Sequence, residues 1–154
     1  MFGSRTVGAI SALALAGATT VLALSSGGSA SAAGSKITCT SLTGTITTSI
    51  KLSGCTGNTG GASANLPSSI LATGGTITWV NGKTTTVTMS LGHTETDPGE
   101  TLSCPASSSE FESKGTVTAD TTGSAPVAGV AKSEECGASG GVLSFEPGTA
   151  LKLK

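Results

Sequence analysis

Aromatic, charged and metal-binding side chains are scarce in this sequence. Of its 154 residues, 3% are aromatic and 11% are charged, tyrosine is absent, and there is one histidine. A formal net charge of −1 gives no long-range attraction to nucleic acid or anionic lipid. One histidine, beside cysteines expected to be oxidised, cannot supply the three or four ligands of a zinc site. We therefore expect no nucleic-acid partner, no metal and no cofactor.

The first 33 residues have the layout of a secretory signal peptide. Arg5 lies in a short polar start, 7–24 is mostly Ala, Leu, Val and Ile, and 25–33 is small and polar. Small residues at the −3 and −1 positions allow cleavage after Ala32 or after Ala33. The alternative is a membrane anchor of about the shortest spanning length, but glycine, serine and threonine interrupt the apolar segment. We expect residues 1–33 to be removed and 34–154 to form one secreted domain without an integral membrane anchor.

Four cysteines remain after this cleavage: Cys39, Cys55, Cys104 and Cys136. An even number of cysteines in an exported chain predicts two disulfides. A two-residue turn at Thr43-Gly44 would separate Cys39 from Cys55 by roughly 23 Å along the strand, too far for a bridge. Short loops close most easily, which favours the pairing Cys39–Cys55 with Cys104–Cys136. The two arguments balance, so this pairing and the other two combined remain about equally favoured.

Threonine and glycine dominate the remaining chain, and this mixture favours strands joined by tight turns over helices. Alternation of apolar and polar residues, clearest around Ile46, Ile50 and Leu52, predicts half-buried strands. The predicted strands are 36–43, 45–53, 76–80, 84–91, 115–120, 142–146 and 150–154. About seven short strands with two disulfides predict an all-β fold, an antiparallel β-sandwich or small barrel.

Two hairpins are predicted from residue parity. A three-residue loop of Val80, Asn81 and Gly82, with Gly82 in the left-handed conformation, places Ile77 and Trp79 on the face of Val87, Met89 and Leu91. A turn at Glu146-Pro147-Gly148 would bring Leu143 and Phe145 beside Leu151 and Leu153 in a C-terminal hairpin.

No pattern of catalytic residues emerges. His93 precedes Glu95, Asp97 and Glu100 in a segment typical of a solvent-exposed acidic loop, and the spacing does not match a twelve-residue calcium loop. Carboxylate pairs such as Glu134 and Glu135 lack the aromatic platforms usual at sugar sites. The sequence therefore predicts no catalytic residue, and we expect that the protein is not an enzyme.

Several segments together resemble the small, Thr/Gly-rich secreted proteins of actinobacteria, many of them uncharacterised. They include Ile37-Thr38-Cys39, Leu52-Ser53-Gly54-Cys55, Gly75-Thr76-Ile77-Thr78-Trp79 and Cys104-Pro105. The resemblance covers nearly all of 34–154. It implies export and fold, and it carries no catalytic residue.

The order of the cysteines, with Pro105 after Cys104, also resembles the subtilisin-inhibitor-like family of secreted protease inhibitors. This resemblance implies that Ala106 is the specificity residue of an inhibitor loop and that Ser107 follows the bond offered to the protease. The 48 residues between Cys55 and Cys104 exceed the family's spacing. Size, export, acidity and two disulfides are shared with the enediyne-carrying apoproteins, although their bridges close shorter loops.

We therefore predict a secreted, non-catalytic β domain that acts through its surface, at the cell envelope or outside the cell. A protein partner fits this interpretation, but the sequence identifies none. Two alternatives remain: a protease inhibitor that uses Ala106 and Ser107, and a carrier of a small ligand.

Overall fold

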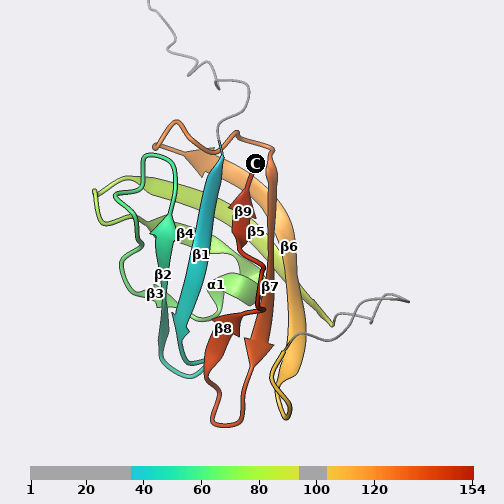
Figure 1. Ribbon diagram of the computed structural model, residues 1–154. Helices are drawn as coiled ribbons and strands as arrows, with labels where there is room; N and C mark the ends of the chain where they lie inside the picture. Colours follow the sequence, from blue (N-terminus) through green and yellow to red (C-terminus); the bar gives the residue numbers. More distant parts are fainter. Residues whose placement is uncertain (1–35, 94–103) are drawn as a thin grey trace, which may run out of the picture.

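The computed structural model describes residues 36–93 and 104–154, which form nine strands and one short helix (Figure 1). The predicted signal peptide, 1–33, and most of the predicted acidic loop lie outside the described residues. The elements are β1 (Ile37–Gly44), β2 (Ser49–Cys55), β3 (Leu66–Pro67), α1 (Ile70–Thr73), β4 (Gly75–Thr78), β5 (Thr84–His93), β6 (Ser109–Asp120), β7 (Val130–Gly137), β8 (Leu143–Phe145) and β9 (Leu151–Leu153).

All strand pairs are antiparallel, and the sheet curls into a nearly closed barrel (Figure 1). The strand order is β3-β2-β1-β9-β7-β6-β5-β4, and β8 pairs with β7. Residues 62–64 link β2, the second strand of this order, to the residues after β4, its last strand, because Ala62 bridges to Ser53 on β2 and Ser63 bridges to Trp79. The predicted all-β antiparallel fold with two disulfides is thus confirmed, in the form of a barrel.

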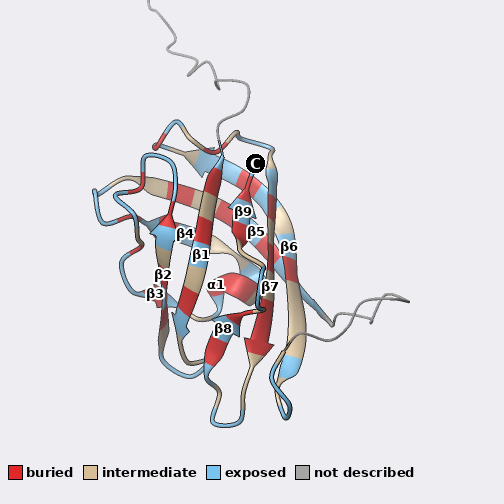
Figure 2. Cartoon of the chain, viewed as in Figure 1, coloured by how far each residue is buried: buried red, intermediate tan, exposed pale blue. Residues whose placement is uncertain are grey.

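The core fills the inside of the barrel with one face of each strand (Figure 2). Alternating burial is clearest on β9, where Leu151 and Leu153 are buried and Lys152 is exposed. Trp79 is the largest fully buried side chain. The period-two pattern that predicts strands therefore also divides the inside of the barrel from its outer surface.

The β1–β2 connection resolves the disulfide alternatives. β1 and β2 pair with Gly44 opposite Ile50, so residues 45–48 form a longer connection than a two-residue turn. Cys39 then lies directly opposite Cys55, and these two residues form a disulfide. Cys104 and Cys136 form the other. The predicted strand at 45–53 starts too early, since Ile46 lies in the connection and its side chain is exposed.

The β4–β5 hairpin has the predicted three-residue loop. The Trp79 amide donates to the Lys83 carbonyl, and Gly82 has φ 80°, a left-handed conformation that glycine adopts without a steric penalty. Ile77, Trp79, Val87 and Met89 are buried together as predicted, whereas Leu91 is largely exposed.

The predicted C-terminal hairpin is wrong. β8 and β9 do not pair with each other: Phe145 lies opposite Glu135, and Leu153 lies opposite Ala131, both on β7. β8 and β9 thus pair with successive parts of the same edge of β7, and residues 146–150 connect them. The sequence pattern misses β7, which provides the partner for both.

Candidate functional site

A pocket of about 440 Å³ opens at the end of the barrel near α1 and the β7–β8 hairpin. Its apolar lining comes from distant parts of the chain and includes Ile46, Leu71, Leu91, Phe111 and Leu143. The one ionisable side chain among the described lining residues is Glu135. A mostly apolar pocket of this size with few polar groups is the usual form of a small-molecule site.

Two glycines in the pocket wall allow apolar side chains to pack closely. A Cβ atom at Gly137 would lie 2.8 Å from the Phe111 ring, so a side chain there would displace the ring. Gly141 has φ +76°, and a Cβ atom there would lie 3.2 Å from Ile46. The glycines of the β7–β8 hairpin therefore leave the space that the Phe111 and Ile46 side chains occupy.

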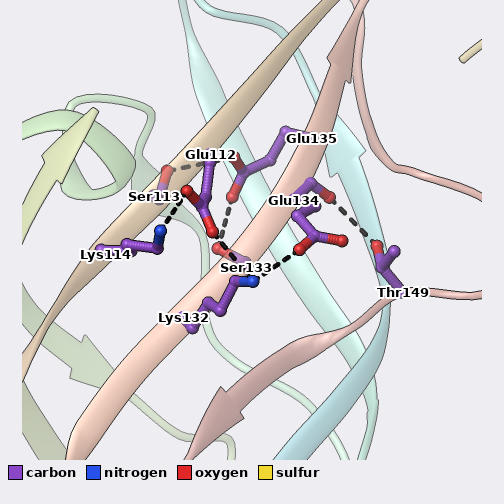
Figure 3. Close-up of polar contacts among 8 residues, drawn as sticks. All are labelled: Glu112, Ser113, Lys114, Lys132, Ser133, Glu134, Glu135 and Thr149. Atoms are coloured by element: carbon purple, nitrogen blue, oxygen red, sulfur yellow. Dashed lines mark hydrogen bonds and ion pairs between the residues drawn. The ribbon is translucent and has the colours of Figure 1, made fainter. Parts of the chain in front are cut away.

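Glu135 lies on the inner face of β7 and its residue is only 1% exposed. The Ser113 hydroxyl on β6 donates to one carboxyl oxygen at 3.0 Å, and the neighbouring Ser133 hydroxyl donates to the other (Figure 3). Burial raises the pKa of Glu135 to about 7, against the lowering effect of these hydrogen bonds; the charges of Glu134 and Glu112 raise it further. The carboxyl therefore changes its charge near neutral pH.

The opposite face of the same two strands carries a ladder of charges (Figure 3). Glu112 pairs with Lys114 and Lys132, and Lys132 also reaches Glu134 at 2.8 Å. Burial alone would raise the pKa of Glu112, but its hydrogen bonds and attraction to the two lysines outweigh it and lower the pKa. The Lys132 ammonium donates hydrogen bonds to the Glu112 and Glu134 carboxylates, and these bonds hold the pKa of Lys132 well above its usual range. This outer ladder engages Lys114 and Lys132, the two lysines of β6 and β7.

A separate polar network joins Trp79 to Asp120. The Trp79 indole donates to the Thr85 hydroxyl at 2.9 Å, and that hydroxyl donates to Asp120 at 2.6 Å. Burial would raise the pKa of Asp120, but hydrogen bonds from Thr85, Thr122 and the Ala125 amide lower it overall. None of these residues lines the pocket. The network satisfies buried polar groups and is structural.

The predicted inhibitor residues, Ala106 and Ser107, lie in an exposed turn beside the Cys104–Cys136 disulfide. The Ser108 amide donates to the Pro105 carbonyl at 3.0 Å, and Ser107 has φ 72°. The backbone of His93 pairs with Phe111, whereas Glu95, Asp97 and Glu100 lie outside the described residues. Residues 36–93 and 104–154 contain no cluster of three or more potential metal ligands.

Sequence reasoning missed the pocket and the role of Glu135. Glu134 and Glu135 are adjacent in sequence, yet they lie on opposite faces of β7, so they do not form a carboxylate pair. A signal was present: in 131–135, Ala131, Ser133 and Glu135 alternate with Lys132 and Glu134. This alternation predicts a strand if small and polar residues, and not only aliphatic ones, are allowed on the inner face.

Comparison with known proteins finds no matching family model, no matching curated protein and no matching solved structure. In the described part of the chain, no helix is long and apolar enough to span a bilayer. Two disulfides are typical of extracellular or other oxidising compartments.

Proposed function

We propose that this protein is a secreted, non-catalytic binding protein that holds a small, largely apolar molecule in the pocket at the end of its barrel. The observation that carries the proposal is the apolar pocket of about 440 Å³ with a single buried carboxyl in its wall. Ligand pockets in proteins fall between about 300 and 1,000 Å³ and combine apolar walls with a few placed polar groups.

Exposed apolar side chains at the pocket support this proposal. Ile46 is 56% exposed and Leu91 is 48% exposed, and both belong to the lining. Large apolar groups in contact with water favour any ligand that covers them, at about 25 cal/mol per Å² of apolar surface removed from water. An apolar ligand would therefore gain from contact with the walls of the pocket.

Export of the protein is part of the proposal. The layout of residues 1–33 is typical of a cleaved signal peptide, and all four cysteines of the chain are paired. A ligand held in the pocket of a disulfide-bonded barrel would be shielded from much of the surrounding medium. The molecule it binds would be one present outside the cytoplasm.

Binding is tested with the neutral fluorophore Nile red and the purified, oxidised protein. We expect saturable binding with one dye per protein. The Ala72→Phe variant places a ring in the pocket lining on α1 and should weaken binding at least about tenfold; the Ala119→Phe variant adds the same ring on the exposed face of β6 and should not. Absence of saturable binding, or equal loss in both variants, would contradict the proposal.

Protease inhibition is a second candidate, favoured by one observation: Ala106 and Ser107 are exposed directly beside a disulfide. A loop ordered before binding loses less entropy when it binds a protease. Titration of subtilisin with the protein, followed by intact-mass analysis, tests this candidate. Stoichiometric inhibition with cleavage confined to the Ala106–Ser107 bond would support it, and digestion without inhibition would exclude it.

A further inference from the structure

Glu135 has no cationic partner among the side chains that the structure describes. The ion pairs there involve Glu112, Glu134, Lys114 and Lys132, all on the outer face of β6 and β7. The elements α1, β1 and β8 contain no lysine, arginine or histidine, and β5 ends with His93, which lies opposite Phe111 on β6. An ionised carboxylate buried without a counter-charge is costly, which makes Glu135 an unusual residue for a merely structural position.

The hydrogen bonds of Glu135 are incomplete for a carboxylate. Each of its oxygens accepts one hydroxyl hydrogen, from Ser113 or from Ser133. A carboxylate has about four acceptor positions on its two oxygens. Two serine donors hold the group in place but leave acceptor capacity for a further donor.

The Glu135 carboxyl lies in the inner wall of the pocket, with two glutamates on the outer face of the same strands. Glu112 and Glu134 act on it from the outer face, and their negative charge disfavours its ionised form. Glu135 lines the pocket but is almost fully shielded from solvent, so it belongs to the inner wall rather than to the mouth. A cation that reached this wall would gain more from pairing with Glu135 than it would in water.

We propose that the natural ligand is an organic cation, an apolar molecule with a protonated amine that pairs with the Glu135 carboxylate. The apolar body of the ligand would lie against Leu71, Leu91 and Phe111, and the ammonium group would donate to the carboxylate between the two serines. This inference rests on the proposed function and specifies its ligand class.

Two probes of matched size separate charge from apolar contact: n-octylamine and n-octanol, measured by calorimetric titration at pH 8. We expect octylamine to bind at least about tenfold more tightly than octanol, because hydrogen bonds to charged groups are the strong ones. The Glu135→Gln variant should lose this preference and still bind octanol. The matched Glu134→Gln variant changes the adjacent carboxylate on the outer face and should keep the preference.

The preference for the amine should also decrease at pH 5, where Glu135 is mostly protonated because burial raises its pKa to about 7. Equal binding of the two probes by the wild type, or a preference that survives Glu135→Gln, would overturn the inference. Binding of Nile red without binding of octylamine would overturn it and leave the proposed function standing. Binding of none of the three compounds would overturn both.

Discussion

The buried carboxyl of Glu135 makes a specific contribution to the pH dependence of stability. Its pKa in the folded protein is raised to about 7 from its ordinary value of 4.5, so the folded state binds the proton more tightly than the unfolded state. Stability should therefore decrease as pH rises from about 4.5 to 7, by up to about 3 kcal/mol. The group contributes no further change above that range.

Urea unfolding of the wild type and of Glu135→Gln between pH 4 and pH 8 measures this contribution. The variant should lack the decrease, whereas Glu134→Gln should retain most of it. The pKa of Asp120 is lowered, so its contribution is lost only as pH falls through a more acidic range. An identical pH profile for the wild type and Glu135→Gln would contradict the prediction.

Thr85 connects the buried indole of Trp79 to the half-buried carboxylate of Asp120. Thr85→Val keeps the shape of the side chain but leaves the Trp79 N–H without its acceptor and removes one donor from Asp120. Leaving a buried polar group unsatisfied costs about 1–3 kcal/mol. We expect a loss of this size in urea unfolding, followed by the fluorescence of Trp79, the only tryptophan.

The neighbouring threonine provides the control for that measurement. The Thr86 hydroxyl pairs with the Thr76 hydroxyl at an exposed position. Thr86→Val should change the free energy of unfolding by no more than about 0.5 kcal/mol. Equal losses in the two variants would show that the hydrogen-bonded chain from Trp79 to Asp120 contributes nothing beyond strand packing.

The pairing of β5 with β6 depends on a glycine in the middle of β6. Gly115 lies opposite Met89, and a Cβ atom there would lie 1.7 Å from the Thr88 carbonyl oxygen. Gly115→Ala must therefore displace backbone, and we expect a loss of more than about 2 kcal/mol in thermal or urea unfolding. Gly92→Ala in β5 is the matched control, because the nearest atom there is 3.7 Å away. Tolerance of both substitutions would contradict the conclusion that the pairing of β5 with β6 depends on Gly115.

Strands with strict alternation were predictable from the sequence, and those with polar inner positions were not. The pattern around Ile77 and Val87 places β4 and β5 correctly, because aliphatic residues mark the inner face. β7 was missed because its inner face carries Ala131, Ser133 and Glu135. The same residues that hide the strand from a hydrophobic pattern supply the polar part of the pocket.

Two further differences between the predicted and the observed elements have local causes. The alternation of apolar and polar residues in β2 extends back to Ile46. This residue, however, lies in the β1–β2 connection and lines the pocket instead of the core. α1 has four residues, too few to produce a helical stripe. The pocket itself is built from residues between Ile46 and Leu143, and no local pattern in the sequence indicates that they meet.

The two disulfides make the stability of the whole barrel depend on an oxidising environment. They close loops of 16 and 32 residues. The chain-entropy relation gives contributions of about 3 and about 4 kcal/mol for loops of these lengths. Single domains have net stabilities of only about 5–15 kcal/mol. Reduction should therefore remove a large share of the stability, and the barrel should persist only where disulfides do.

Three proteins test this dependence on oxidation: the wild type, the Cys39→Ala/Cys55→Ala variant and the Cys104→Ala/Cys136→Ala variant. The oxidised wild type should show no titratable thiol under native conditions, since all four cysteines are paired. Each double variant should unfold at a lower urea concentration, and dithiothreitol should lower the midpoint of the wild type below that of either variant. A wild-type midpoint unchanged by reduction would mean that the barrel does not need an oxidising compartment, and the structural argument for export would fail with it.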